Sequence, residues 1–342
     1  MKAAVITEPK KILEMEVEKP VLQEGEALIK VKYAGICGSD MHLFHGAYKK
    51  SPMPIIPGHE FVGELVELKG EAADGISVGD MVALEPAVAC GVCEACLEGH
   101  ENTCLKLNII GIHSNGGFAQ YVKGPVRNLV KISPDCDVRR AALIEPLAVA
   151  YHDLRQSGLR FGQKALVVGS GPIGMLIAMV CRQAGASVVA MSEVNDFRID
   201  FAEKAGFVAL NGRDPDFYDK AMALTENKGF DVIFECSGTG IGVNNSIKLA
   251  KPMGVIVQVG MGFGEPAINI FDITYREIEM RGVRIHPMKD FKMAADVLNS
   301  GVMNDDLDLL ITKEFELKDI TEAFRYQEED QEHFKVIVKM PE

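Results

Sequence analysis

The sequence predicts two domains, a β-rich domain and an α/β domain with a doubly wound parallel sheet. The first observation is length, because 342 residues exceed what one domain usually holds. The second is that short apolar runs alternate with turns up to about residue 147, which is typical of a small β-barrel or sandwich. The third is that strands and helical stretches alternate after that point, which indicates a parallel sheet with helices on both faces.

The strands expected in the first part are short apolar runs bounded by turn residues such as Gly25 and Gly79. They cover residues 2–7, 26–33, 60–68, 80–84, 118–122 and 129–132. The N-terminal run lacks the length and polarity of a secretory signal peptide, so we expect a cytoplasmic protein.

In the second part, strands and helices follow each other at regular intervals. Strands are expected at 163–168, 187–191, near 208, and at 231–236, 254–259 and 281–285, with helices ending at 184 and covering 196–205, 216–226 and 243–250. The tail contains a helix at 290–299, a strand at 310–315, a helix at 320–326 and a strand at 334–340. We expect this tail to return to the first domain, so that residues 1–147 and 283–342 form one domain around an inserted domain of residues 148–282.

The composition excludes several classes of function. A net charge of −13 argues against a nucleic-acid partner, because binding phosphates requires excess Lys and Arg. No apolar run reaches the roughly 20 residues of a membrane span, so no membrane partner is expected. Eight cysteines in a chain of this kind suggest metal or redox chemistry before disulfides.

The stretch from Cys37 to Glu60 brings together a thiol, an imidazole and a carboxylate. Cys37, His59 and Glu60 offer the ligand types that a catalytic zinc uses, and Glu145 is a further carboxylate far along the chain. The alternative for Cys37 is a buried apolar thiol.

Ser39 and His42 follow Cys37 by two and five residues and could move a proton away from a metal-bound alcohol. The alternatives are a turn-capping hydroxyl for Ser39 and a surface imidazole for His42.

A second metal site is expected in a cysteine-rich loop. Cys90, Cys93, Cys96 and Cys104 form the pattern C-x2-C-x2-C-x7-C. Four thiolates complete a tetrahedral zinc, which marks a structural site without an open position. A disulfide pair or an iron–sulfur cluster is the alternative.

A glycine-rich turn begins the second domain after the apolar run 163–168. Its functional positions are Gly169, Gly171, Pro172, Ile173 and Gly174. The glycines permit the tight turn, the approach of a pyrophosphate and close helix packing, while the phosphates meet the N-terminus of the following helix. A glycine-rich turn that binds no nucleotide is the alternative.

Three further residues are candidates for the cofactor site. Glu193 lies at the end of the next strand, about 20 residues after the turn, where a carboxylate accepts the ribose hydroxyls and repels a 2′-phosphate. This favours NAD over NADP. Arg198 could stack on adenine or be a cation on a helix face, and Ser237, directly after the strand 231–236, is a further cofactor-binding candidate.

Taken together and in order, these motifs resemble the zinc-containing medium-chain dehydrogenase/reductase family over essentially the whole chain. They are the segments 37–40 and 58–63, the cysteine quartet, the segment 145–147 and the glycine turn. Glu145 followed by Pro146 and Leu147 resembles the sorbitol, threonine and sugar-acid dehydrogenases, and the segment 110–118 resembles bacterial members such as L-galactonate dehydrogenases. One departure is His286, which stands where an aromatic residue often lies in the substrate segment.

The resemblance implies a GroES-like β-barrel catalytic domain and a Rossmann coenzyme domain. It implies a catalytic zinc on Cys37 and His59 with Glu60 or Glu145 as the third ligand, a structural zinc, and transfer of hydride from a secondary alcohol of a polyol or sugar acid to NAD. Threonine or a simple diol is the alternative substrate, and a non-catalytic NAD-binding protein is the competing class. By family analogy we expect a homodimer or homotetramer, with the sheet edge near 268–271 extended across a two-fold axis.

Overall fold

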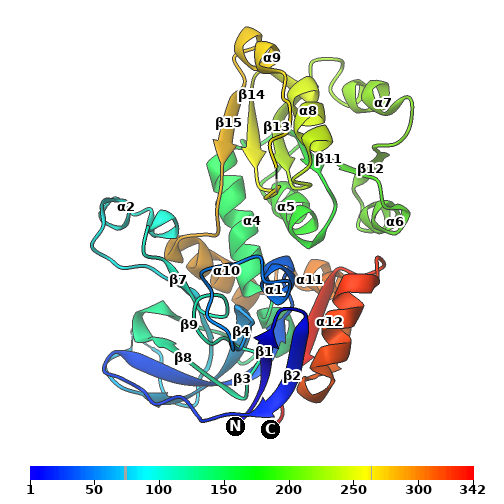
Figure 1. Ribbon diagram of the computed structural model, residues 1–342. Coiled ribbons are helices and arrows are strands. Elements are labelled where there is room, and N and C mark those ends of the chain that lie inside the picture. The colour runs from blue at the N-terminus through cyan, green and yellow to red at the C-terminus, as the bar shows by residue number, and fades with distance from the viewer. Residues whose placement is uncertain (73–74, 263) are drawn as a thin grey trace. The chain divides into compact units, whose positions relative to one another are not determined.

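The computed structural model of the protein describes residues 1–72, 75–262 and 264–342 (Figure 1). Within these residues the chain forms two compact units, one of Met1–Ala148 with His286–Glu342 and one of Val149–Ile285. Helix α4 (Ile144–Ser157) runs through the first boundary. Among the described residues, no helix combines the length and the apolar character that a membrane crossing requires.

The first unit is built on a largely antiparallel sheet. In its described residues the sheet has seven strands, in the order β16-β17-β3-β4-β5-β9, with β8 pairing β3. The strands are β3 (Glu26–Gly35), β4 (Glu60–Leu68), β5 (Met81–Leu84), β8 (Tyr121–Pro125), β9 (Leu129–Lys131), β16 (Ile311–Glu316) and β17 (Lys335–Lys339). Because β17 pairs with β3 through Val338 and Ala34, the C-terminal tail returns to this sheet.

Shorter elements complete the first unit around a buried apolar core that includes Ile29, Phe61 and Val336. Two small sheets are formed by β1 (Lys2–Glu8) with β2 (Lys11–Glu16) and by β6 (Ala87–Val88) with β7 (Asn108–Ile109). The helices are α1 (Gly38–Phe44), α2 (Glu94–Leu97), α3 (Val138–Ala141), α10 (Met288–Ser300), α11 (Asn304–Leu310) and α12 (Ile320–Glu329), with the 3-10 turns η1 (Glu101–Thr103), η2 (Val126–Asn128) and η3 (Leu317–Asp319).

The second unit is an α/β domain. In its described residues a six-stranded parallel sheet has the order β12-β11-β10-β13-β14-β15. The elements are β10 (Lys164–Val168), α5 (Pro172–Gln183), β11 (Val188–Glu193), α6 (Asp196–Lys204), β12 (Val208–Asn211), α7 (Phe217–Ala223), β13 (Phe230–Glu235), α8 (Gly240–Leu249), β14 (Ala250–Gln258), α9 (Ile270–Tyr275) and β15 (Glu279–Gly282). The strand order reverses between β10 and β13, and ligands of such sheets bind at this switch point.

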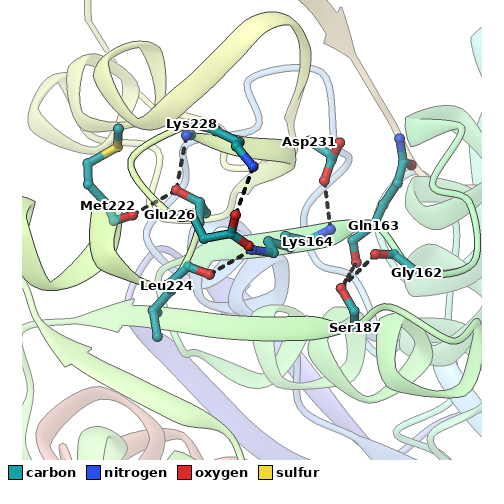
Figure 2. Close-up of polar contacts among 11 residues, drawn as sticks. Gly162, Gln163, Lys164, Ser187, Met222, Leu224, Glu226, Lys228 and Asp231 are labelled. Carbon is teal, nitrogen blue, oxygen red and sulfur yellow. Dashed lines mark hydrogen bonds and ion pairs between the residues drawn. The ribbon is translucent and has the colours of Figure 1, made fainter.

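Polar contacts anchor the amino end of β10, opposite the switch point (Figure 2). Lys164 donates its backbone N–H to Asp231 at 2.8 Å and its ammonium to the Leu224 carbonyl at 3.1 Å. The Ser187 hydroxyl donates to the Gly162 carbonyl at 2.6 Å. These contacts link the starts of three neighbouring strands, β11, β10 and β13.

Some predicted elements differ from the structure. The segment 268–271 is no sheet edge, because Asn269 caps α9 by accepting a hydrogen bond from the Asp272 N–H at 3.3 Å. The last strand of the second unit, predicted at 281–285, is instead β15, paired with β14 from Glu279 to Gly282. In the predicted strand 118–122, Phe118 and Ala119 bridge to β1, so β8 begins only at Tyr121.

Candidate zinc and cofactor sites

The backbone around Cys37 and Gly58 is held together by one buried carboxylate. Cys37 is the N-cap of α1 and donates its N–H to Asp40 at 2.9 Å, while the other Asp40 oxygen accepts the Gly58 N–H at 3.1 Å. Asp40 is fully buried. It therefore joins two segments of the chain and brings the Cys37 thiol beside the His59 ring.

Three of the four predicted catalytic ligands converge. Ligand atoms of Cys37, His59 and Glu60 all lie within 4.8 Å of one another, and both His59 and Glu60 are buried. Burial alone would lower the pKa of His59, but the neighbouring Asp40 and Cys37 raise it well above its usual value. The Nδ1 atom of His59 lies 3.6 Å from Asp40, which is the carboxylate–histidine arrangement that orients zinc-binding imidazoles. A thiol, an imidazole and a carboxylate fit a catalytic zinc.

Glu60 has a buried partner that sequence reasoning missed. The ammonium of Lys335, at the start of β17, forms an ion pair with Glu60 and donates to the Ile36 carbonyl at 3.1 Å. Lys335 is only 3% exposed. Burial and Glu145 raise the pKa of Glu60, and Lys335 opposes that rise. No local spacing signals Lys335, because it lies 275 positions beyond Glu60 and meets it only through the pairing of β17 with β3.

Glu145 lies in the first turn of α4 and is also buried. Among the described residues it is not part of the group within 4.8 Å, which contains Glu60. Its Oε1 lies 3.5 Å from Nε2 of His286, and Nδ1 of the same ring lies 3.8 Å from Glu85. The ring of His286 is fully buried, with an exposed fraction of 0%.

The two predicted proton carriers lie on α1. The Ser39 hydroxyl is 3.3 Å from Nε2 of His59, so it lies within the metal-binding group. His42 follows one turn later on the same helix, with its ring edge-on to Tyr48 at a centroid distance of 6.4 Å.

The cysteine quartet forms a compact cluster of thiols. Ligand atoms of Cys90, Cys93, Cys96 and Cys104 all lie within 4.8 Å of one another, and the sulfurs of Cys93 and Cys96 are 3.4 Å apart. Hydrogen bonds from the backbone N–H groups of Val92 and Cys93 lower the pKa of Cys90 to about 6. All eight cysteines of the sequence are free thiols. Four thiols in this arrangement fit a structural zinc rather than a disulfide pair.

The glycine turn joins β10 to α5. Gly169 has a φ of +96°, and a Cβ there would lie 3.0 Å from the Ser237 nitrogen, so the tight turn requires glycine. A Cβ on Gly174 would overlap the Gly169 carbonyl, which explains the close packing of helix and strand. At Gly171 the space is open except for the Arg198 guanidinium, 3.8 Å from such a Cβ. Pro172 and Ile173 then begin α5, whose free N–H groups fit a pyrophosphate.

Glu193 is tied to the glycine turn. Its carboxylate accepts hydrogen bonds from the backbone N–H groups of Ser170 at 2.8 Å, Val194 at 2.6 Å and Asn195 at 3.1 Å. Ser237 lies across the switch point, after β13, where the fully buried Glu235 accepts its N–H at 3.0 Å and that of Gly238 at 3.0 Å. Sequence reasoning missed Glu235, although it directly precedes the loop that carries Ser237.

Comparison with known proteins agrees with both parts of the chain. Residues 23–134 match the alcohol dehydrogenase GroES-like domain, and residues 172–300 match the zinc-binding dehydrogenase domain. The chain is 36% identical over 318 residues to a 2-dehydro-3-deoxy-L-galactonate 5-dehydrogenase of Pseudoalteromonas atlantica, covering 93% of this chain and 92% of the relative. It is 32% identical over 316 residues to an L-threonine 3-dehydrogenase of a Shewanella species, covering 91% of each chain.

A solved structure supports the same conclusion. A Sinorhizobium meliloti protein assigned as a zinc-binding dehydrogenase, in complex with NADP, superposes with a TM-score of 0.90 at 32% identity, covering 99% of this chain and 98% of that one. The predicted GroES-like and Rossmann architecture is thereby confirmed. On this evidence, the chain is an oxidoreductase that belongs to the zinc-binding alcohol dehydrogenase family.

Proposed function

We propose that the protein oxidises a secondary alcohol of a polyol or sugar acid with NAD. The observation that carries this proposal is the close group of the half-buried Cys37 with the buried His59 and Glu60. A second carboxylate, Glu145, is close enough to influence the Glu60 pKa. When bound, zinc supplies Lewis acidity at the substrate hydroxyl and the nicotinamide accepts the hydride. The relative that acts on a sugar acid supports this substrate class.

The roles of the individual residues follow from their positions. Cys37 and His59 would hold the metal, and Glu60 or Glu145 would supply the third protein ligand. Ser39 would accept the substrate's hydroxyl proton, because its oxygen lies 3.3 Å from the ring nitrogen of His59. His42, one turn along α1, would receive that proton and pass it to solvent.

The second unit would bind the dinucleotide at the switch point of its sheet. Gly171 would approach the pyrophosphate, Arg198 would contact the adenosine, and Ser237 would lie on the nicotinamide side. Glu193 supports NAD as the preferred cofactor, because its carboxylate is held beside the Ser170 N–H and would repel a 2′-phosphate. The related structure with NADP makes this preference the first point to measure.

Threonine is the second candidate substrate, favoured by the 32% identical L-threonine 3-dehydrogenase. The two substrates place different charges beside the oxidised carbon, an ammonium in threonine and hydroxyls or a carboxylate in sugar acids. Both would use the same zinc, proton and hydride chemistry.

The proposal also covers the limits of the two domains, the oligomeric state and the cellular location. We assign residues 1–147 and 283–342 to the zinc-binding domain and residues 148–282 to the NAD-binding domain, supported by the two compact units. A homodimer or homotetramer is supported by exposed apolar residues on α9, the helix that precedes the edge strand β15 in the chain. Phe271 and Tyr275 stack on each other and are 70% and 77% exposed. The free thiols support a reducing, cytoplasmic location.

The decisive experiment combines metal analysis with a substrate screen. Purified protein should contain two zinc ions per chain and reduce NAD with polyols, aldonates or amino alcohols. Activity highest on an aldonate supports the first candidate, and activity highest on threonine supports the second. Zinc-loaded protein that reduces NAD with none of these classes would refute the proposed function.

A further inference from the structure

Two buried residues that are not predicted zinc ligands, Glu85 and His286, form a chain of titratable groups that ends at Glu145. Glu85 Oε1 lies 3.8 Å from Nδ1 of His286, and Nε2 on the opposite side of that ring lies 3.5 Å from Glu145 Oε1. The exposed fractions are 5% for Glu85, 0% for His286 and 7% for Glu145. Water therefore cannot replace any of these partners freely, and each group depends on the next for its orientation.

Further contacts fix the positions of Glu85 and His286. The backbone of Glu85 exchanges two hydrogen bonds with Asn128, from the Glu85 N–H to the Asn128 carbonyl and from the Asn128 amide to the Glu85 carbonyl, each at 2.9 Å. The ring of His286 stacks on the buried Phe291 at a centroid distance of 5.5 Å and an interplanar angle of 17°.

The backbone before His286 is unusual. Ile285 has a φ of +51°, in the left-handed region that β-branched residues avoid. Such a conformation persists only where the surrounding structure over-determines it, and these positions cluster at functional sites. The strained backbone of Ile285 thus sets the direction in which the His286 side chain enters the protein interior.

The two carboxylates near the zinc ligands have different partners. Glu60 is paired with the ammonium of Lys335, whereas Glu145 faces the imidazole of His286. An ammonium offers three rotatable donors, but a ring nitrogen offers one donor in a fixed direction. A protonated imidazole between two carboxylates can therefore attract one oxygen of Glu145, Oε1, at an ion-pair distance of 3.5 Å and leave the other oxygen available.

We infer that Glu85 and His286 are positioning residues that fix the Glu145 carboxylate for its work beside the zinc. Glu85 acts through His286, and His286 acts through Glu145, so neither touches substrate or metal. This inference rests on the proposed role of Glu145 in the zinc site. It predicts that substitutions of Glu85 and His286 change metal binding and activity only while Glu145 is present.

The test is a double-mutant cycle on protein whose catalytic zinc has been replaced by Co²⁺. Glu85→Gln and His286→Gln should each shift the visible Co²⁺ spectrum, weaken metal binding about 10- to 100-fold, and lower kcat for NAD reduction more than they raise KM. In a Glu145→Ala background, adding either substitution should change the spectrum and the metal affinity no further. Glu98→Gln, at the exposed C-cap of α2, is the matched control and should leave all values unchanged.

Two outcomes would overturn the inference. One is an unchanged spectrum and metal affinity in both single variants, and the other is additive losses in the Glu145→Ala background. Far-UV circular dichroism identifies a variant that fails to fold. Glu85→Gln and His286→Gln test the same row of side chains independently, so one variant can serve if the other does not fold. Failure of the proposed function would look different, because the wild type would then reduce NAD with no alcohol, while its Co²⁺ spectrum could still be compared among the variants.

Discussion

The ammonium of Lys335 is buried against the carboxylate of Glu60, which lies beside the thiol of Cys37 and the imidazole of His59. The pair joins the last strand, β17, to β4, although 275 positions of the sequence separate the two residues. Burial alone would lower the pKa of Lys335, but Glu60 and Cys37 raise it. The site therefore contains a positive charge that balances its anionic ligands before any metal binds.

Replacing Lys335 should destabilise the metal-free protein. In Lys335→Met the Glu60 carboxylate would be buried without a partner, which costs about 3–5 kcal/mol of unfolding free energy. Zinc should restore part of the loss, because the freed carboxylate can then bind the ion. Urea denaturation with and without zinc measures both effects. Lys339→Met, at the exposed end of the same strand, is the control. Equal stability of Lys335→Met and the control without zinc would contradict the pairing.

The cysteine quartet should hold one of two zinc ions. Cys96→Ser should reduce the metal content from two zinc ions to about one and lower the thermal midpoint, because binding of a structural zinc is coupled to folding of its loop. Mass spectrometry of metals and a thermal scan check this. Cys136→Ser, which lies outside both metal groups, should keep both ions. A Cys96→Ser protein with full zinc and unchanged stability would disprove the structural site.

Cofactor preference should depend on Glu193. Wild-type kcat/KM should favour NAD over NADP by at least about tenfold, since one charge repulsion of 1.4 kcal/mol corresponds to that factor. The double variant Glu193→Ser with Val194→Arg should shift the preference toward NADP. Initial rates with both cofactors measure the ratio, and Asp196→Ser, an exposed acid three residues later, is the control. Equal use of both cofactors by the wild type would contradict the assignment.

Glu145 should determine which alcohols are oxidised. A carboxylate is a more weakly held zinc ligand than a thiolate, so the metal can accept two oxygens of a substrate with neighbouring hydroxyls. We expect wild type to prefer 2,3-butanediol, sorbitol and hexonates over 2-butanol. Glu145→Ala should lose most activity and bind zinc weakly, while Glu145→Cys should keep zinc but lose the preference. Steady-state rates of the wild type and both variants on these substrates test this expectation. A fully active Glu145→Ala enzyme would rule out this role of Glu145.

Glu85 should make stability depend on pH. Burial raises its pKa to about 7, with Glu101 and Glu145 adding to the rise and His286 and Arg127 opposing it. The folded protein thus holds a proton that the unfolded chain releases near pH 4.5, so stability should fall as pH rises from about 4.5 to 7. Glu85→Gln should flatten this decline. Urea denaturation at several pH values compares the two proteins, and identical slopes would show that Glu85 does not titrate in this range.

The sequence by itself determined the family, the two kinds of fold and the cofactor chemistry. These depend on local patterns, since the glycine turn, the cysteine quartet and the strand and helix periodicities each lie within a few dozen residues and follow from backbone geometry. The comparisons confirm the fold and the family. The roles of the individual site residues stay predictions.

Only the tertiary structure decided what surrounds those residues. Lys335 reaches Glu60 because β17 pairs with β3, and His286 meets Glu85 and Glu145 although the three lie on separate segments. No spacing along the chain encodes such contacts, because each depends on strand pairing and burial between distant positions. Charged residues of this kind look like surface residues in a sequence, and their burial beside opposite charges becomes visible only when the chain is folded.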